Sequence, residues 1–186
     1  MRRKLKLLVF LFAANAGIGC KVGTKPIIST GRGEIIYHNG TSKRTDLQLP
    51  DGTRVLLNPT SAIRLSAGFD SVNRDLFLEG EALFTVNPRE APSFVVHTKA
   101  FVTTVMDSSM AEFKVNALPG SPGEEVDLLT GILNVSKSYH SDTDNELVTL
   151  GAGEMVMINT DIDLMEKEKS DSTEWKDWIK GKGENK

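Results

Sequence analysis

One short pattern recurs along this chain: two apolar residues spaced two apart, then a glycine, then a second apolar run. It occurs four times, at 47–52, 76–80, 126–131 and 148–153. Alternation with a period of two is typical of a β-strand with one buried face. Glycine accepts the positive φ that an abrupt change of direction requires. Repetition of this unit predicts a body of stacked strand–Gly–strand hairpins and argues against a helical fold.

The clearest copy of the unit is Arg74–Val86, in which Gly80 separates two apolar strands. We expect four of its side chains to face the core: Leu76, Leu78, Phe84 and Val86. Glu79 and Glu81 flank the glycine. Two carboxylates so placed could act in acid–base chemistry, but beside a turn they are more typical of a solvated surface.

The fold class predicted from this pattern is all-β. No long segment within 35–158 shows helical periodicity, and short strands recur roughly every ten residues with turn signals between them. The pattern leaves two architectures open: a solenoid-like roll of stacked hairpins, or a two-sheet sandwich.

One short helix is predicted near the C-terminus. Asp171 and Glu174 have the spacing of a capping box, and Trp175 and Trp178 then fall on one helical face. Such a helix is too short to be stable alone. The two tryptophans therefore either dock on the β body or contact a partner, and they are the candidate binding residues. Residues 161–186 are interpreted as a charged linker, this helix and a polar tail.

The N-terminus has the features of a secretory signal peptide, assigned to 1–19. A basic start precedes an apolar run from Leu7 that is too short to span a bilayer core of about 30 Å. Cys20, the single cysteine, follows Gly17-Ile18-Gly19, which resembles the lipobox of bacterial lipoproteins. We expect Cys20 to be lipidated and 20–33 to form a tether, so that the protein is anchored in the cell envelope, on the periplasmic side. Plain secretion and an uncleaved N-terminal anchor are the alternatives.

Composition excludes several functions. The net charge of −3 and pI near 5.7 are unlike those of a nucleic-acid-binding protein. The three histidines show no metal-ligand spacing, and no nucleophile elbow or phosphate-binding fingerprint occurs. The sequence therefore predicts no catalytic residues, no metal site, no cofactor and no enzymatic activity.

Several segments, in order, resemble the FecR-type periplasmic domain. Leu49–Asn58 resembles the opening signature of that family, and Arg74–Val86 is similar to its most recognisable block. Later strands of the family correspond to 92–98, 126–135 and 147–158. The FecR-like domain is thus assigned to 34–160.

The resemblance implies an all-β, non-catalytic domain of the anti-sigma-factor-type regulator family. In that family the domain is usually the periplasmic half of a transmembrane sigma-factor regulator that receives a signal from a TonB-dependent receptor. The usual cytoplasmic sigma-binding domain and C-terminal domain have no counterpart among the matched motifs, and Trp178 stands where the family has glycine.

Two functional hypotheses follow. The first is a membrane-anchored protein-interaction or sensor module in envelope signalling, whose partner is a TonB-dependent receptor or a sigma regulator. The second is an envelope lipoprotein that binds glycan or peptidoglycan, or serves as a structural scaffold. Sugar stacking on Trp175 and Trp178 would distinguish the second hypothesis from the first.

Overall fold

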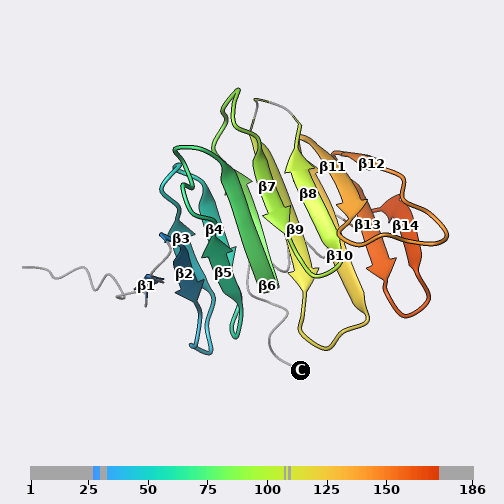
Figure 1. Ribbon diagram of the computed structural model, residues 1–186, viewed down its shortest axis with the longest axis horizontal. Coiled ribbons are helices and arrows are strands. Elements are labelled where there is room, and N and C mark those ends of the chain that lie inside the picture. Colours follow the sequence, from blue (N-terminus) through green and yellow to red (C-terminus); the bar gives the residue numbers. More distant parts are fainter. Residues whose placement is uncertain (1–26, 30–32, 107, 109, 172–186) are drawn as a thin grey trace, which may run out of the picture.

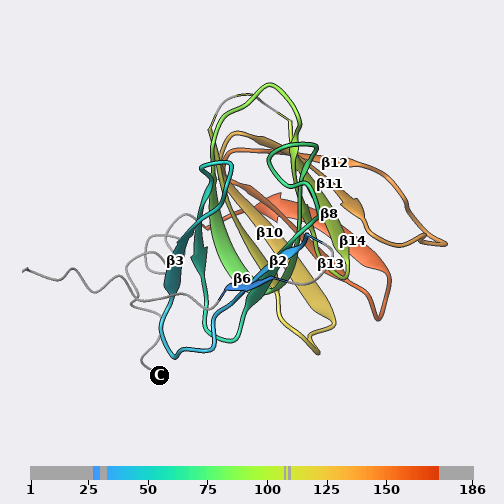
Figure 2. The same ribbon diagram turned by 60° about the vertical axis from the view of Figure 1, so that its left-hand side comes forward.

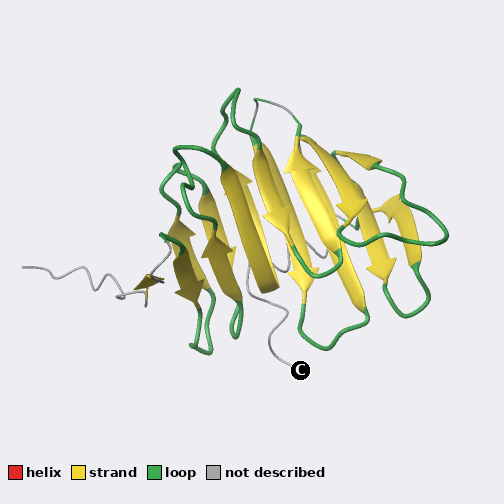
Figure 3. Cartoon of the chain, viewed as in Figure 1, coloured by secondary structure: helices red, strands yellow, loops and turns green. Residues whose placement is uncertain are grey.

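The computed structural model describes residues 27–29, 33–106, 108 and 110–171, and every regular element in these ranges is a β-strand (Figure 3). The all-β prediction is therefore confirmed. The predicted C-terminal helix, with Trp175 and Trp178, lies outside the described residues. The strands are β1 (Ile27–Ser29), β2 (Ile35–His38), β3 (Thr45–Gln48), β4 (Arg54–Leu57), β5 (Ala62–Leu65), β6 (Arg74–Val86), β7 (Phe94–His97), β8 (Phe101–Val105), β9 (Ala111–Ala117), β10 (Gly123–Thr130), β11 (Ile132–Lys137), β12 (Val148–Gly151), β13 (Glu154–Asn159) and β14 (Leu164–Lys169).

The strands form two layers that share β6. In sheet A the order is β1-β2-β5-β6-β7-β8-β11-β12. In sheet B it is β3-β4-β6-β9-β10-β13-β14. Figure 2 shows β2 and β3 in different layers. The pairing is antiparallel except between β6 and β7.

The chain advances steadily along both layers. Successive pairs of strands alternate between the sheets, and the molecule extends from β1 on the left of Figure 1 to β14 on the right. Two facing sheets and a one-directional winding are therefore properties of the same fold. The sequence presented them as alternatives because strand–Gly–strand periodicity is the same in both.

The core lies between the sheets. All four predicted core residues of β6 are at most 4% exposed, and Phe84 is fully buried. The Phe84 ring stacks on Phe113 at 5.2 Å between centroids and meets Phe94 edge-on at 6.0 Å. Aromatic pairs at these separations add to the stabilisation that comes from apolar burial alone.

Gly80 is where β6 passes from one sheet to the other. Leu76 and Leu78 pair with β5 in sheet A, whereas Ala82 and Phe84 pair with β4 and β9 in sheet B. Gly80 has φ of +103°, and a Cβ there would lie 2.3 Å from the Ser61 Oγ. That hydroxyl accepts a hydrogen bond from the backbone N–H of Glu81 at 2.9 Å. The bend therefore needs glycine for both its conformation and its close contact.

The other three glycines of the repeat also have positive φ but differ in role. Gly131 and Gly153 lie between strands of different sheets, whereas Gly52 turns the β3–β4 hairpin within sheet B. The repeated sequence pattern thus corresponds to two kinds of turn.

A buried ion pair joins the ends of β6 to the β3–β4 turn. The Arg74 guanidinium donates to the Asp51 carboxylate from Nε at 2.9 Å and from Nη2 at 2.7 Å. Nη2 also donates to the Asn87 carbonyl at 2.8 Å. Thr53 donates to Asp51 through both its N–H and its hydroxyl. Both charged side chains are at most 2% exposed, so Asp51 has a partner beyond its own turn.

Two peripheral segments contain strands that the sequence did not indicate. Ile27–Ser29, within the expected tether, pairs with β2 as β1. Leu164–Lys169, within the expected charged linker, is the edge strand β14. Its residues are mostly exposed, as expected of a charged segment. Lys167 donates to Glu154 at 2.6 Å and to the Thr149 carbonyl at 2.9 Å. The charged residues of β14 leave no apolar alternation by which the sequence would reveal the strand. Charged residues on edge strands also oppose unwanted strand pairing.

Substituting Gly80→Ala should lower the free energy of unfolding by about 2–5 kcal/mol, because it adds backbone strain to overlap with Ser61. Gly153→Ala is the matched control: its φ is +80°, yet a Cβ there would meet nothing within 4 Å. Strain alone should cost the control about 1–2 kcal/mol. Urea unfolding measures both variants, and equal losses would contradict the proposed contact with Ser61.

Candidate functional site

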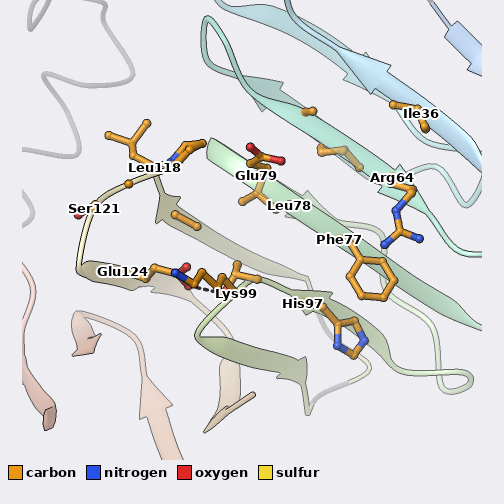
Figure 4. A pocket seen from close by; sticks show the side chains of 16 residues that line it. Ile36, Arg64, Phe77, Leu78, Glu79, His97, Lys99, Leu118, Ser121 and Glu124 are labelled. Carbon is orange, nitrogen blue, oxygen red and sulfur yellow. Dashed lines mark hydrogen bonds between the residues drawn. The ribbon is translucent and has the colours of Figure 1, made fainter. Parts of the chain in front are cut away.

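A groove of about 510 Å³ opens where β6 bends. Its walls come from the outer face of sheet A, the β7–β8 turn and the β9–β10 loop. Figure 4 labels these of its lining residues: Ile36, Arg64, Phe77, Leu78, Glu79, His97, Lys99, Leu118, Ser121 and Glu124. The volume lies in the range of small-ligand pockets.

One wall is a row of side chains across four strands. The register places Ile36 beside Arg64, Arg64 beside Phe77, and Phe77 beside His97. The Arg64 guanidinium carbon lies 4.1 Å from the Phe77 ring centroid. The His97 ring stacks on Phe77 at 4.9 Å and 23°.

This stack is held in place by its neighbours. Arg64 Nη1 donates to a carboxylate oxygen of Glu34 at 2.9 Å, which fixes the guanidinium over the ring. Arg64 and His97 both stack on the Phe77 ring, and Phe77 remains 39% exposed. The row therefore offers a partner a preformed, half-apolar surface.

The opposite wall is set by Glu124 at the start of β10. Its carboxylate accepts hydrogen bonds from the Thr98 hydroxyl and, at 3.1 Å, from the backbone N–H of Ala100. Thr98 and Ala100 belong to the β7–β8 turn of sheet A, so Glu124 bridges the two sheets. Leu118, in the adjoining β9–β10 loop, is 46% exposed. This wall combines a fixed carboxylate with an accessible apolar side chain.

Glu79 and Glu81 do not form a carboxylate pair. Glu79 lines the groove on sheet A. Glu81 accepts a hydrogen bond from Asn58 and lies 3.7 Å from Lys114 on sheet B. The bend at Gly80 sends the two side chains to different sheets, which removes the geometry that shared acid–base work requires.

A second polar cluster centres on Asp163. Its carboxylate accepts hydrogen bonds from Ser141 at 2.5 Å, Lys137 at 2.9 Å, Thr143 at 2.9 Å and Tyr139 at 3.0 Å. These donors, Ser141 first, hold the pKa of Asp163 well below its usual value. Burial and, after it, the hydrogen bond and negative charge of Asp163 raise the pKa of Tyr139. The cluster fastens the β11–β12 loop to the β13–β14 turn, which is a structural role.

The predicted site residues Cys20, Trp175 and Trp178 lie outside the described residues. Within the described ranges, no group of His, Cys, Asp and Glu has the geometry of a metal site. No described helix could cross a membrane. Sequence reasoning missed the groove residues Arg64, Phe77, His97 and Glu124. Their positions on strands were readable, but which strands lie side by side was not.

Fold and groove together define a two-sheet β domain with a preformed surface groove. Residues 36–131, more than half of the chain, match the family described as FecR protein. The chain belongs to the FecR protein family. This confirms the family that its motifs suggested.

Two crystal structures of a proposed anti-sigma factor from Parabacteroides distasonis ATCC 8503 have a similar fold. One has a TM-score of 0.69 at 25% identity and is matched over 80% of this chain. The other has a TM-score of 0.68 at 26% identity, over 78% of this chain. The match spans 65% of the length of each of those structures. No curated protein matches the chain.

The Tyr139 phenol should titrate above its ordinary pKa of 10.0. The Tyr37→Phe background removes the other tyrosine, so that an ultraviolet titration reports Tyr139 alone. Adding Asp163→Asn should bring the pKa of Tyr139 back toward 10.0, because the negative charge beside the phenol is lost. An unchanged titration in that variant would show that Asp163 does not act on Tyr139 in solution.

Proposed function

We propose that this protein is a cell-surface signalling regulator that works by binding a partner protein through the groove. The observation that carries the proposal is the combination of FecR family membership with a preformed, partly apolar groove on the outer face of sheet A. The likeness to structures of a proposed anti-sigma factor supports the same class. The activity is binding, without catalysis.

In its finer form, the proposal places the protein at the membrane of the cell envelope, on the periplasmic side, anchored through a lipid on Cys20. The basic start, the short apolar run and the cysteine after Gly17-Ile18-Gly19 support this anchor. A TonB-dependent receptor or a sigma-factor regulator is the proposed partner, by analogy with the FecR family.

The geometry of the groove suits a protein partner. Side chains held by stacking and ion pairs lose little conformational freedom on binding, so less of the interaction energy is spent on ordering them. Leu118 and Phe77 supply exposed apolar area on two sides. A sugar would need a free aromatic face on which to stack, and the Phe77 ring already carries stacking contacts from Arg64 and His97. The groove therefore favours a protein over a glycan.

A capture experiment from native envelope tests the proposal. The full chain carrying Cys20→Ala and an affinity tag serves as soluble bait, and a Leu118→Asp version places a charge in the apolar wall. We expect Leu118→Asp to reduce capture of a receptor or regulator at least tenfold, because the apolar contact is lost and the new carboxylate must give up its hydration on binding. Quantitative mass spectrometry measures the captured protein.

Val72→Asp is the matched control. Val72 is 77% exposed and lies in the β5–β6 loop, outside the groove. It should leave capture unchanged, and circular dichroism should show all baits folded. Recovery of no receptor or regulator by the folded Cys20→Ala bait would refute the proposed function. Equal capture by both Asp variants would remove the groove from it.

A further inference from the structure

Glu124 places a buried carboxylate in the lining of the groove. We infer that the groove accepts a peptide segment of the partner in which a lysine or arginine lies beside Glu124 and an apolar side chain packs against Leu118. This inference rests on the proposed function and specifies the chemistry of the partner. It is carried by the burial of Glu124, its hydrogen bonds and the charges around it.

Glu124 is a carboxylate withdrawn from water but not neutralised by a cation. The residue is 6% exposed. One of its carboxylate oxygens, Oε2, accepts hydrogen bonds from the Thr98 hydroxyl and the Ala100 N–H, both neutral donors. No ion pair to Glu124 occurs among the residues that the structure describes. A buried carboxylate is most stable with an opposite charge nearby, and a basic side chain entering the groove would provide it.

The cations that line the groove do not fill this role. Arg64 is engaged by Glu34 and by the Phe77 ring on the other wall. Lys99 is exposed at the rim, where water and salt screen its charge. Glu79 adds a second carboxylate to the lining. The least screened charge in the groove is therefore negative, which favours a basic ligand over an acidic one.

The apolar part of the groove lies next to this charge. Leu78, Ala117 and Leu118 line it on the side of the β9–β10 loop, and Figure 4 shows Leu78 between Leu118 and the Phe77 ring. A volume of about 510 Å³ holds a few side chains of an extended segment. A peptide with a basic residue between two apolar residues matches this order of groups, and a charge-assisted hydrogen bond to Glu124 would orient it.

Peptide titrations test the inference. The probes are Ac-Gly-Leu-Lys-Leu-Gly-NH₂ and the same peptide with norleucine in place of lysine, which keeps the chain and removes the charge. Titrated into the isotope-labelled full chain carrying Cys20→Ala, the lysine peptide should bind at least fivefold more tightly. Its nuclear magnetic resonance shift changes should map to the groove.

Glu124→Gln should abolish this preference while retaining an acceptor for Thr98 and Ala100, so that the fold is preserved. Glu90→Gln, an exposed carboxylate outside the groove, should keep the preference. The inference is overturned if neither peptide binds in the groove, if both bind equally, or if Glu124→Gln retains the preference. If Leu118→Asp abolishes envelope capture and Glu124→Gln does not, the groove binds a partner but does not require a basic residue beside Glu124. The proposed function would then stand and this inference would fail.

Discussion

The buried ion pair between Arg74 and Asp51 is the interaction on which the rest of the structure depends. Arg74 begins β6, and its guanidinium reaches both the β3–β4 turn and the carbonyl of Asn87, just past the end of β6. Because Arg74 precedes the bend at Gly80 and Asn87 follows it, the hydrogen bond between them links the two ends of the bent strand. Removing one member of a buried ion pair typically costs about 3–5 kcal/mol, because the other charge is left unpaired. The pair therefore opposes any structure in which β6 straightens.

The bend in β6 also produces the groove. Because β6 leaves sheet A at Gly80, the outward-facing residues just before the bend, Phe77 and Glu79, face the groove. Gly80 lies opposite Ala117, so the β9–β10 loop begins beside them. The groove is thus built by the same elements that close the sandwich, and Glu124 completes it by joining β10 to the β7–β8 turn.

Local patterns were sufficient to predict much of the fold. Alternation identified the core residues of β6, and glycine marked the bends, because strand periodicity and φ are properties of neighbouring residues. Long-range pairing was not predictable in this way. Asp51 lies in the β3–β4 turn, and its partner Arg74 is 23 residues further along the chain. Arg64, Phe77 and His97 form one row only because of the order of β5, β6 and β7.

In-cell photocrosslinking tests most directly whether the groove binds an envelope partner. The photoreactive amino acid p-benzoylphenylalanine would replace Leu118 in one chain and Val72 in another. Irradiation should join the chain with the probe at Leu118 to one discrete envelope protein and give no such product from the chain with the probe at Val72. Absence of a product at Leu118, or equal products at both positions, would contradict the assignment of the groove as the partner-binding surface.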